Sequence, residues 1–462
     1  MLQPANRLPP EIIPRITQHI LRDSDDTYLI IPLTHVCRYW RQAIISAPEN
    51  WTLISTLRTK LTALTLERSK AAGLQLRLDP YAAGFHNFCD LIAPYIQNVE
   101  TLQFGVFDAL KQLTQALPNF PKSTPNLRML ELTVMRRLDA SIDPFESFPN
   151  TLVSLSLDDI PLYPSFLKLR TLRKLSLKYR NMHCPALDTL LDFLEENLSL
   201  ESVDLTIETD QQFLAHSSHR QATIANQLQH LSIDANDAMI ARTLISHIPL
   251  RRGAHLEIIS YGDGSDDEEL GLDNVLSGIS MTHLSNLSSP TFMECRSPDP
   301  AIRLVGPNGS FLFVRHWFPG IYLGIYPAET SVLPLTNIRE LRLAHSDPSN
   351  MFLPSSIPAL ETLTIECDTN ISDLFSALLP NPSFSPSLKT LGFLHCAITE
   401  EFMEELAQFA SDRKNTTSAW LHRVVIIHLD GRVPTAASIH GLEEHVPIVD
   451  VRFGRTFPTD LT

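Results

Sequence analysis

The sequence predicts an α/β protein in which a short N-terminal helical module precedes a long array of parallel strands joined by helices or irregular returns. Three observations lead to this prediction. The chain has 462 residues, more than the ~250–300 at which a single hydrophobic core stops growing. Apolar residues recur at helical spacing near the N-terminus, and a six-residue apolar pattern recurs along the rest of the chain. An array of repeated units escapes the size limit because each unit packs only on its neighbours.

The helical module is expected over residues 1–58. Leu8-Pro9-Pro10 indicates a helix start, because proline suits the first helical turn, where its missing N–H is not needed. An acidic turn at 23–26 and Pro48 separate and end the helices. A module this small carries more apolar surface than it can bury alone, so some of it should meet a partner or the next domain. Two apolar stripes at helical spacing define the helices: Ile12, Ile13, Ile16 and Ile20, then Leu29, Leu33, Val36, Cys37 and Trp40.

The pattern apolar-x-x-apolar-x-apolar recurs through residues 59–462. In the two regular stretches, successive occurrences start 20 to 36 residues apart. These intervals bracket the ~20–29-residue period of leucine-rich repeats, in which each unit gives one short parallel strand and one return. We therefore expect a solenoid with its strands on the concave face and its helices or irregular returns outside. The ten occurrences are Val99-Leu102-Phe104, Leu127-Leu130-Leu132, Leu152-Leu155-Leu157, Leu172-Leu175-Leu177, Leu200-Val203-Leu205, Leu228-Leu231-Ile233, Ile338-Leu341-Leu343, Leu360-Leu363-Ile365, Leu388-Leu391-Phe393 and Val424-Ile427-Leu429.

The returns and turns between these strands are less regular. Return helices are expected around residues 187–194, 371–378 and 402–409, where leucines and other apolar residues follow helical spacing. The asparagine that commonly ladders the turns of such repeats is mostly replaced: Asn236 fits the position, but Arg180, Ser346 and Asp368 occupy it elsewhere. The repeats are therefore degenerate.

An acidic and Ser/Pro-rich region at about 262–310 interrupts the repeats. Its acidic run lacks the Asp-x-Asp-x-Asp-Gly ligand order of a calcium loop, so we expect a solvated, mobile loop. Aromatic-rich strands at 311–314 and 321–326 are expected to continue the sheet in altered form.

Composition excludes several classes of partner. The formal net charge of −15 argues against a nucleic-acid binder, which needs a basic face, and against attachment to an anionic membrane. The six cysteines stand singly, which is typical of buried thiols in a reducing compartment. No signal peptide or transmembrane segment is indicated. We expect a soluble intracellular protein, either cytoplasmic or nuclear.

The sequence holds no motif typical of catalysis. It lacks a phosphate-binding GxxxxGK[ST] loop, a dinucleotide-binding GxGxxG and a GxSxG nucleophile turn. His216-x-x-His219 has no third ligand in a recognisable pattern, so surface histidines are the better interpretation than a metal site. The chain is therefore predicted to be no enzyme and to need no cofactor or metal.

The N-terminal module resembles a known family. Leu8-Pro9, Glu11-Ile12 and Ile16, followed about 25 residues later by Val36-Cys37-Arg38-x-Trp40-Arg41 and then by Pro48 and Trp51, look like the F-box. The chain departs from that pattern at Pro10 and at Glu49-Asn50. The repeat body and its RKNTTSAWLHRVVII segment are similar to fungal F-box proteins. The resemblance implies a three-helix F-box that docks to the Skp adaptor of a cullin ubiquitin ligase. The docking surface would consist of Leu8, Pro9, Ile12, Ile16, Leu33, Val36, Cys37 and Trp40.

The leading hypothesis is therefore a non-catalytic substrate receptor of an SCF-type ubiquitin ligase, which holds a target protein through its repeats. Tethering would raise the effective concentration of the target at the ligase. The candidate target-binding residues lie between the inward leucines, although they would equally serve as solvated filler: Glu131, Ser156, Lys174, Ser176, Lys178, Asp204, Ser232, Arg342, Thr364 and His428.

The alternative is a repeat scaffold for protein–protein interactions whose helical module only caps the array. A pure cap should bury Leu8, Pro9 and Ile12 against the first repeats. Docking predicts instead that these side chains remain accessible.

Overall fold

The fold is seen in a computed structural model, in which the chain divides into two compact units, Met1–His216 and Ser217–Thr462. The two units are described separately. The structure describes residues 8–24, 27–56, 59–78, 85–104, 124–133, 150–163, 165–166, 169–180, 184–208, 227–262, 275–276, 279, 284, 289–296, 301–317, 333, 335–345, 357–367, 385–396, 398–416, 420–428 and 434–453.

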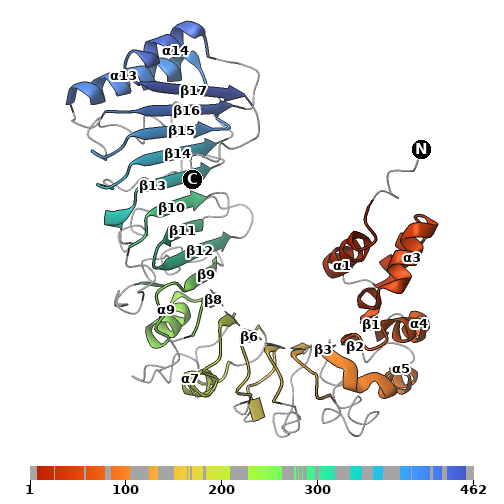
Figure 1. Ribbon diagram of the computed structural model, residues 1–462. Coiled ribbons are helices and arrows are strands. Elements are labelled where there is room, and N and C mark those ends of the chain that lie inside the picture. The colour runs from red at the N-terminus through yellow and green to blue at the C-terminus, as the bar shows by residue number, and fades with distance from the viewer. Residues whose placement is uncertain are drawn as a thin grey trace. The chain divides into compact units, whose positions relative to one another are not determined.

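The first unit opens with the helical module, which lies beside the first strands (Figure 1). The predicted boundary between residues 58 and 59 lies inside this unit and stays a prediction. The helices of the module are α1 (Ile12–Ser24), η2 (Thr27–Leu29), α2 (Ile30–Thr34), α3 (Arg38–Ser46) and η3 (Pro48–Trp51).

The second apolar stripe of the module does not form one continuous helix. Helix α2 ends at Thr34, and Cys37 takes an extended conformation with φ −163° before α3 starts. The Cys37 sulfur accepts a hydrogen bond from the Trp40 backbone N–H at 3.5 Å, so Cys37 is the N-cap of α3. The expectation that Leu29 to Trp40 share one helical stripe was therefore wrong.

A parallel sheet fills the rest of the first unit. Each strand pairs with the next one along the chain, from β1 to β7. Inward-facing leucines are buried on one face, and amphipathic return helices bury their apolar side there. The elements are β1 (Leu53–Ser55), α4 (Thr59–Ser69), β2 (Leu74–Leu78), α5 (Phe85–Ile92), η5 (Ala93–Asn98), β3 (Val99–Phe104), β4 (Met129–Thr133), β5 (Ser154–Asp158), β6 (Lys174–Tyr179), α7 (Leu187–Glu196) and β7 (Ser202–Ile207).

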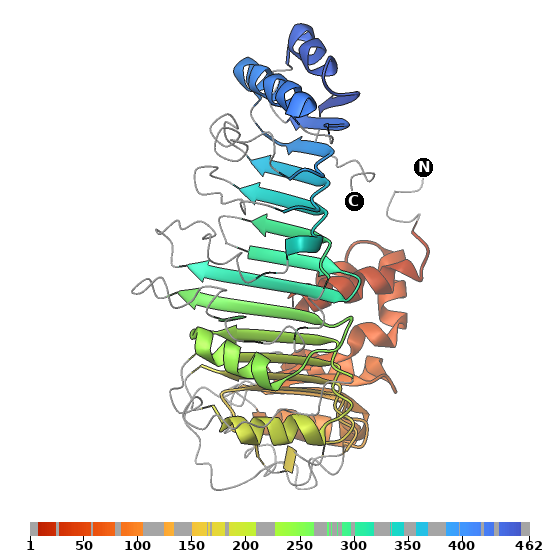
Figure 2. The same ribbon diagram turned by 90° about the vertical axis from the view of Figure 1, so that its left-hand side faces the viewer.

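The second unit contains a mostly parallel sheet whose strands lie side by side, with two helices at its C-terminal end (Figure 2). Its elements are β8 (His230–Ala235), α9 (Ala238–His247), β9 (His255–Gly262), β10 (Phe292–Arg296), β11 (Ala301–Gly306), β12 (Gly309–Trp317), η9 (Leu335–Asn337), β13 (Glu340–His345), β14 (Thr362–Cys367), β15 (Thr390–Leu394), α13 (Glu400–Thr416), β16 (Arg423–His428), α14 (Ala436–Glu443) and β17 (Ile448–Phe453).

The region expected to be a loop at 262–310 contributes strands to this sheet. Strand β11 pairs antiparallel with both β10 and β12, while β12 pairs parallel with β9 and β10 parallel with β13. The order across the sheet is therefore β9, β12, β11, β10, β13, and the expectation of a loop was wrong for residues 292–296 and 301–306. The strand expected at 311–314 is confirmed within β12, and the one at 321–326 lies outside the described residues.

Nine of the ten repeat patterns are confirmed as strands with the expected apolar side chains buried. The tenth, Val424-Ile427-Leu429, was placed in the wrong register. Leu391 pairs with Val424 and Phe393 with Ile426, so the equivalent set is Leu421-Val424-Ile426, all buried. Of the return helices, those expected at 187–194 and 402–409 are confirmed as α7 and α13, and 371–378 lies outside the described residues.

Short hydroxyl side chains tie successive repeats together in the first unit. Thr171 donates its hydroxyl to the Leu152 carbonyl at 2.8 Å, and Ser199 donates to the Leu172 carbonyl at 2.8 Å. Each residue directly precedes the first leucine of a repeat pattern, as does Thr151, which donates to Leu127 at 2.8 Å. This ladder satisfies backbone carbonyls between repeats.

Asp159 takes the ladder role that was expected of asparagine. It is buried, with φ 56°, and its Oδ1 accepts the Arg180 backbone N–H at 2.7 Å. Asn236, which fits the ladder position in the sequence, is exposed, and its ladder role stays a prediction. Ser346 and Asp368 lie outside the described residues.

Candidate functional site: the apolar surface of the helical module

The helical module has a hydrophobic core of its own. Ile13, Leu21, Ile30, Ile44 and Trp51 are buried together. The Trp51 indole N–H donates to the Ile44 carbonyl at 3.0 Å, which satisfies the polar atom of a buried ring. Some of the apolar side chains of the module are therefore buried in its own core.

The Arg68 guanidinium lies 4.4 Å from the centroid of the Trp51 ring. This cation–π contact joins α4, in the first repeat, to η3 of the module. The core of the module is thus anchored to the start of the strand array.

None of the eight residues predicted to bind the adaptor is fully buried. Pro9, Ile12 and Val36 are exposed, Ile12 by 36% and Val36 by 51%. The remaining five, which include Ile16 and Cys37, are half-buried. The other three pack against the core of the module and therefore support it: Leu8, Leu33 and Trp40.

Doubled isoleucines explain why apolar side chains remain outside. Ile13 points into the core while its neighbour Ile12 is exposed, and Ile44 is buried while Ile45 is exposed. Adjacent residues on a helix lie about 100° apart, so both cannot face one core. Sequence reasoning missed Ile45 and the exposed Tyr28, although the Ile44-Ile45 pair was a signal for the former.

Hydrogen bonds hold the N-terminal segment against the start of α3. The Tyr39 hydroxyl donates to the Leu8 carbonyl at 2.9 Å, and the Ile12 N–H donates to the Pro9 carbonyl at 3.0 Å. Arg41 Nε donates to the Thr34 carbonyl at 3.0 Å, across the turn between α2 and α3. Leu8 is thereby fixed close to the helix that begins after Cys37, which brings two halves of the predicted adaptor set into one region.

The predicted target-binding residues of the first unit lie on the polar face of its sheet, opposite the buried leucines. Lys174 is exposed, and the other five are half-buried: Glu131, Ser156, Ser176, Lys178 and Asp204. Glu131, Ser156, Ser176 and Asp204 form one row across neighbouring strands. The structure thus brings these residues together on one face.

The charges on this face are mixed. Burial raises the pKa of Asp158, and the nearby Asp159 carboxylate raises it further, while Arg180 and Lys178 lower it. Gln103 Nε2 donates to Glu131 Oε2 at 2.8 Å. A surface that alternates lysine, serine and carboxylate selects no single charge in a partner.

The predicted target-binding residues of the second unit are less available. Thr364 is buried, which contradicts its assignment to an open surface. Arg342 donates to Glu366 Oε2 at 2.6 Å and its Nε lies 3.8 Å from Glu294 Oε1. Ser232 is half-buried. His428 belongs to β16, but its side chain lies outside the described residues.

The described ranges hold no candidate metal site. No group of three or more His, Cys, Asp or Glu side chains there could hold a metal ion. His216 and His219 lie outside these ranges. Cys89, Cys184, Cys295 and Cys396 are buried thiols, as expected, and burial followed by the Asp90 charge raises the pKa of Cys89 to about 11. Within the same residues, no helix has the length and apolar content to cross a membrane.

Comparison with known proteins gives no relative to set beside this geometry. No protein-family model matches the chain, and no curated protein matches its sequence. The functional argument therefore rests on the surfaces described above.

Proposed function

We propose that this chain is a non-catalytic substrate receptor of an SCF-type ubiquitin ligase. In this proposal the helical module is an F-box that binds the Skp adaptor of the cullin core, and the strand array is a leucine-rich-repeat solenoid that holds a target protein. Ubiquitin would be transferred by other subunits, with the receptor acting by proximity.

The accessibility of the predicted adaptor set carries the proposal. The module has a closed core, yet it leaves Pro9, Ile12 and Val36 in solvent. Apolar side chains exposed in one region of a folded unit favour an interaction site, and the Tyr39–Leu8 hydrogen bond holds the segment next to Pro9 against the start of α3. A cap would instead cover Leu8, Pro9 and Ile12 with the first repeats, and the alternative of a capped scaffold without a ligase is disfavoured for that reason.

The regular pairing of the strands supports the repeat assignment. Nine patterns predicted from the sequence form strands with leucines buried on one face, and strands β3 to β7 and β13 to β16 pair parallel in chain order. Backbone hydrogen bonds also link successive repeats. For example, the Arg173 carbonyl accepts hydrogen bonds from the backbone N–H groups of Glu201 and Ser202, at 2.8 and 3.0 Å. Such stacking is the arrangement expected of a solenoid.

The adaptor interaction is tested with a double substitution, Ile12→Glu with Val36→Glu, in the full chain. Both side chains are exposed, so the variant should fold. Two carboxylates in an apolar interface should cost about 2–4 kcal/mol, or roughly 30- to 1,000-fold in adaptor affinity. The measurement is retention of purified Skp adaptor, followed by titration calorimetry.

Leu198→Glu is the matched control, because Leu198 is 61% exposed in the same unit but outside the module. Its adaptor affinity should equal that of the wild type. Failure of the wild type to bind the adaptor would overturn the ligase role and leave the scaffold alternative. Equal binding by wild type and the double variant would show that a different surface is used.

A further inference from the structure

Strand β17 forms the C-terminal end of the sheet of the second unit (Figure 1). Among the strand pairings that the structure describes, β17 pairs with β16 alone, from Ile448 beside Arg423 to Phe453 beside His428. The outer edge of β17 therefore presents backbone N–H and C=O groups, an arrangement that lets a further strand join a sheet.

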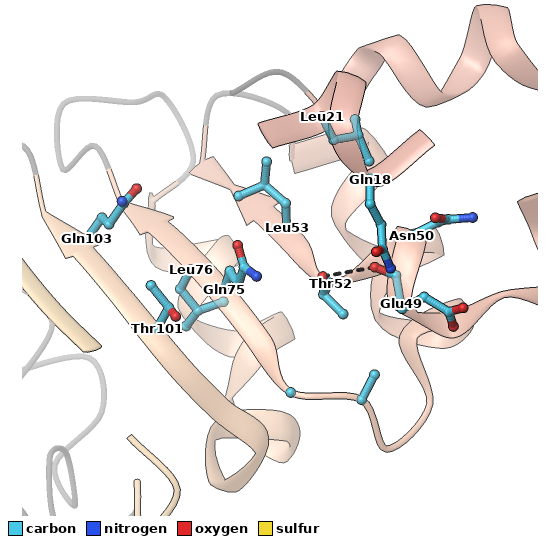
Figure 3. Close-up of a pocket in the computed structure, with 12 residues that line it drawn as sticks. Gln18, Leu21, Glu49, Asn50, Thr52, Leu53, Gln75, Leu76, Thr101 and Gln103 are labelled. Atoms are coloured by element: carbon cyan, nitrogen blue, oxygen red, sulfur yellow. Dashed lines mark hydrogen bonds between the residues drawn. The ribbon is translucent and has the colours of Figure 1, made fainter. Parts of the chain in front are cut away.

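The first strand of the first unit shows how a sheet edge is protected. Strand β1 has only three residues, and η2 of the helical module lies against it. Figure 3 shows Gln18 and Leu21 of α1 on one side of Leu53 in β1, and Gln75 and Thr101 of the next two strands on the other; these residues line an open hollow. Short edges and covering elements both deter strand addition. Strand β17, by contrast, has six residues.

The apolar layer of the second unit is less well covered at β17 than at the strand before it. Val449 and Val451 lie in register with Val424 and Ile426 of β16. The two β16 side chains are fully buried, whereas the two valines of β17 remain half-buried although helix α14 packs against this strand. A further strand would extend the apolar layer past them.

The backbone groups of β17 alternate between its two sides. The Ile448 N–H donates to the His422 carbonyl at 3.2 Å, so the backbone groups of Ile448 and of every second residue after it face β16. Val449, Val451 and Phe453 therefore direct their N–H and C=O groups to the outer edge. An added antiparallel strand must place its own outward-facing residues opposite these three, because opposed residues exchange their hydrogen bonds.

Asp450 and Arg452 give the polar face of β17 one charge of each sign. Arg452 donates to the Asp450 carboxylate at 2.9 Å from Nε and at 2.6 Å from Nη2, and the side chain of Arg452 is 46% exposed. An edge strand with charges of one sign repels a copy of itself. A strand with both signs meets its copy favourably in a register that places the opposite signs face to face.

We infer that β17 pairs antiparallel with β17 of a second copy of this chain, around a twofold axis at Val451. Val451 then exchanges both backbone hydrogen bonds with Val451 of the second copy, and each Asp450 lies opposite an Arg452 at a Cα separation of about 4.5 Å. Registers shifted by two residues would place Asp450 opposite Asp450, or Arg452 opposite Arg452. The charges thus select one register, in which the apolar face continues across the axis. Such a dimer goes beyond the proposed function and would carry two helical modules.

Sedimentation velocity of the full chain over about 1–200 μM tests this pairing. The wild type should dimerise reversibly, and Arg452→Asp and Asp450→Arg should each weaken self-association at least about tenfold, because like charges then meet. An equimolar mixture of the two variants should restore dimers, because each strand then meets opposite charges. Arg252→Asp is the matched control, since Arg252 is exposed in the turn before β9, and its dimer affinity should equal that of the wild type.

Val451→Pro tests the backbone pairing without a change of charge. The Val451 N–H faces the outer edge, so proline removes the central hydrogen bonds of the dimer and none to β16. The variant should keep the circular dichroism spectrum of the wild type and lose self-association.

A wild type that stays monomeric up to about 200 μM overturns the inference. A dimer that withstands all three β17 substitutions does so as well, because another surface then holds it. A mixture of the two charge variants that stays monomeric contradicts the register. Slow backbone hydrogen exchange at Val449 and Val451 in a monomeric wild type would mean that a segment of the same chain covers the edge, and would also exclude the dimer.

Discussion

The polar face of the sheet differs between the two units, although the same apolar pattern defines the opposite face in both. In β3 to β7 of the first unit, the residues between the buried apolar side chains are exposed or half-buried, and all but Met129 are polar or charged. In β14 to β16 of the second unit, the corresponding face buries Thr364 and the apolar cluster Leu394, Val425 and Ile427.

A chain of charges also crosses the polar face of the second unit. Glu294 lies between Arg303 and Arg342, at 3.7 and 3.8 Å, and Glu366 contacts both Arg342 and His395. On the neighbouring strand, Gly392 lets the backbone of β15 pack closely against Thr364, because a Cβ at Gly392 would lie 3.3 Å from Thr364 Oγ1. The first unit thus keeps this face available to a partner, while the second uses much of it for internal contacts.

The largest expected effect comes from removing the buried carboxylate. Glu294 is 2% exposed, and Glu294→Ala would leave Arg342 without one of its two partners in a partly dehydrated site. We expect the free energy of unfolding to fall by about 1–3 kcal/mol. Glu131→Ala on the open face of the first unit should cost less than about 1 kcal/mol. Urea denaturation of both variants measures the difference, and equal losses would contradict the contrast between the two faces.

A smaller effect is expected from two residues that occupy equivalent turns. Asp159 and His395 both have positive φ, 56° and 62°, and each donates its backbone N–H to the following repeat strand, at 2.7 and 2.6 Å. The Asp159 carboxylate also accepts the Arg180 backbone N–H, whereas the His395 ring contacts the Glu366 side chain.

Because alanine meets the same backbone strain at both positions, the difference between the two alanine variants isolates the side chains. Asp159→Ala should cost about 1–2 kcal/mol and His395→Ala about half of that. Asp159→Asn keeps an acceptor and should retain most of the stability. The unfolding midpoints of the three variants, read in urea, give the comparison. A larger loss for His395→Ala would refute this account of the turn.

The parallel strands of the repeats were predictable because their buried apolar residues, mostly leucines, recur at a fixed spacing in the sequence. The register failed at β16, where Val424 to Ile427 are apolar on both faces, so that two alignments fit equally well. The sequence did not predict strands β10 and β11, because β11 pairs antiparallel with both its neighbours and these strands do not carry the repeat pattern.

The site was predictable only in part, for reasons of packing. The F-box-like motif located the exposed Ile12 and Val36, and the doubled Ile44-Ile45 held a further signal. The burial of Thr364 depends on what packs across the sheet, which strand alternation alone does not encode. The open hollow beside β1 joins Gln18 to Gln75 and Thr101, residues whose proximity follows only from the folded chain.

The smallest effect concerns acid sensitivity, which should separate the two units. Burial lowers the pKa of His255, and His230, stacked on it at 5.0 Å, lowers it further together with Arg303, while Glu257 raises it. The native state therefore binds the proton less readily than the unfolded chain. The contribution of His255 to stability is complete above the unfolded histidine pKa of about 6.5 and declines as the pH falls below it.

No histidine occurs in strands β1 to β7. Backbone hydrogen exchange should therefore rise in β8 and β9 between pH 7.5 and 5.5, while exchange in the strands of the first unit changes less. Replacing His255 with Gln, which retains a hydrogen-bonding group near Ser310, should flatten that response; an unchanged acid response would mean that other groups govern the second unit.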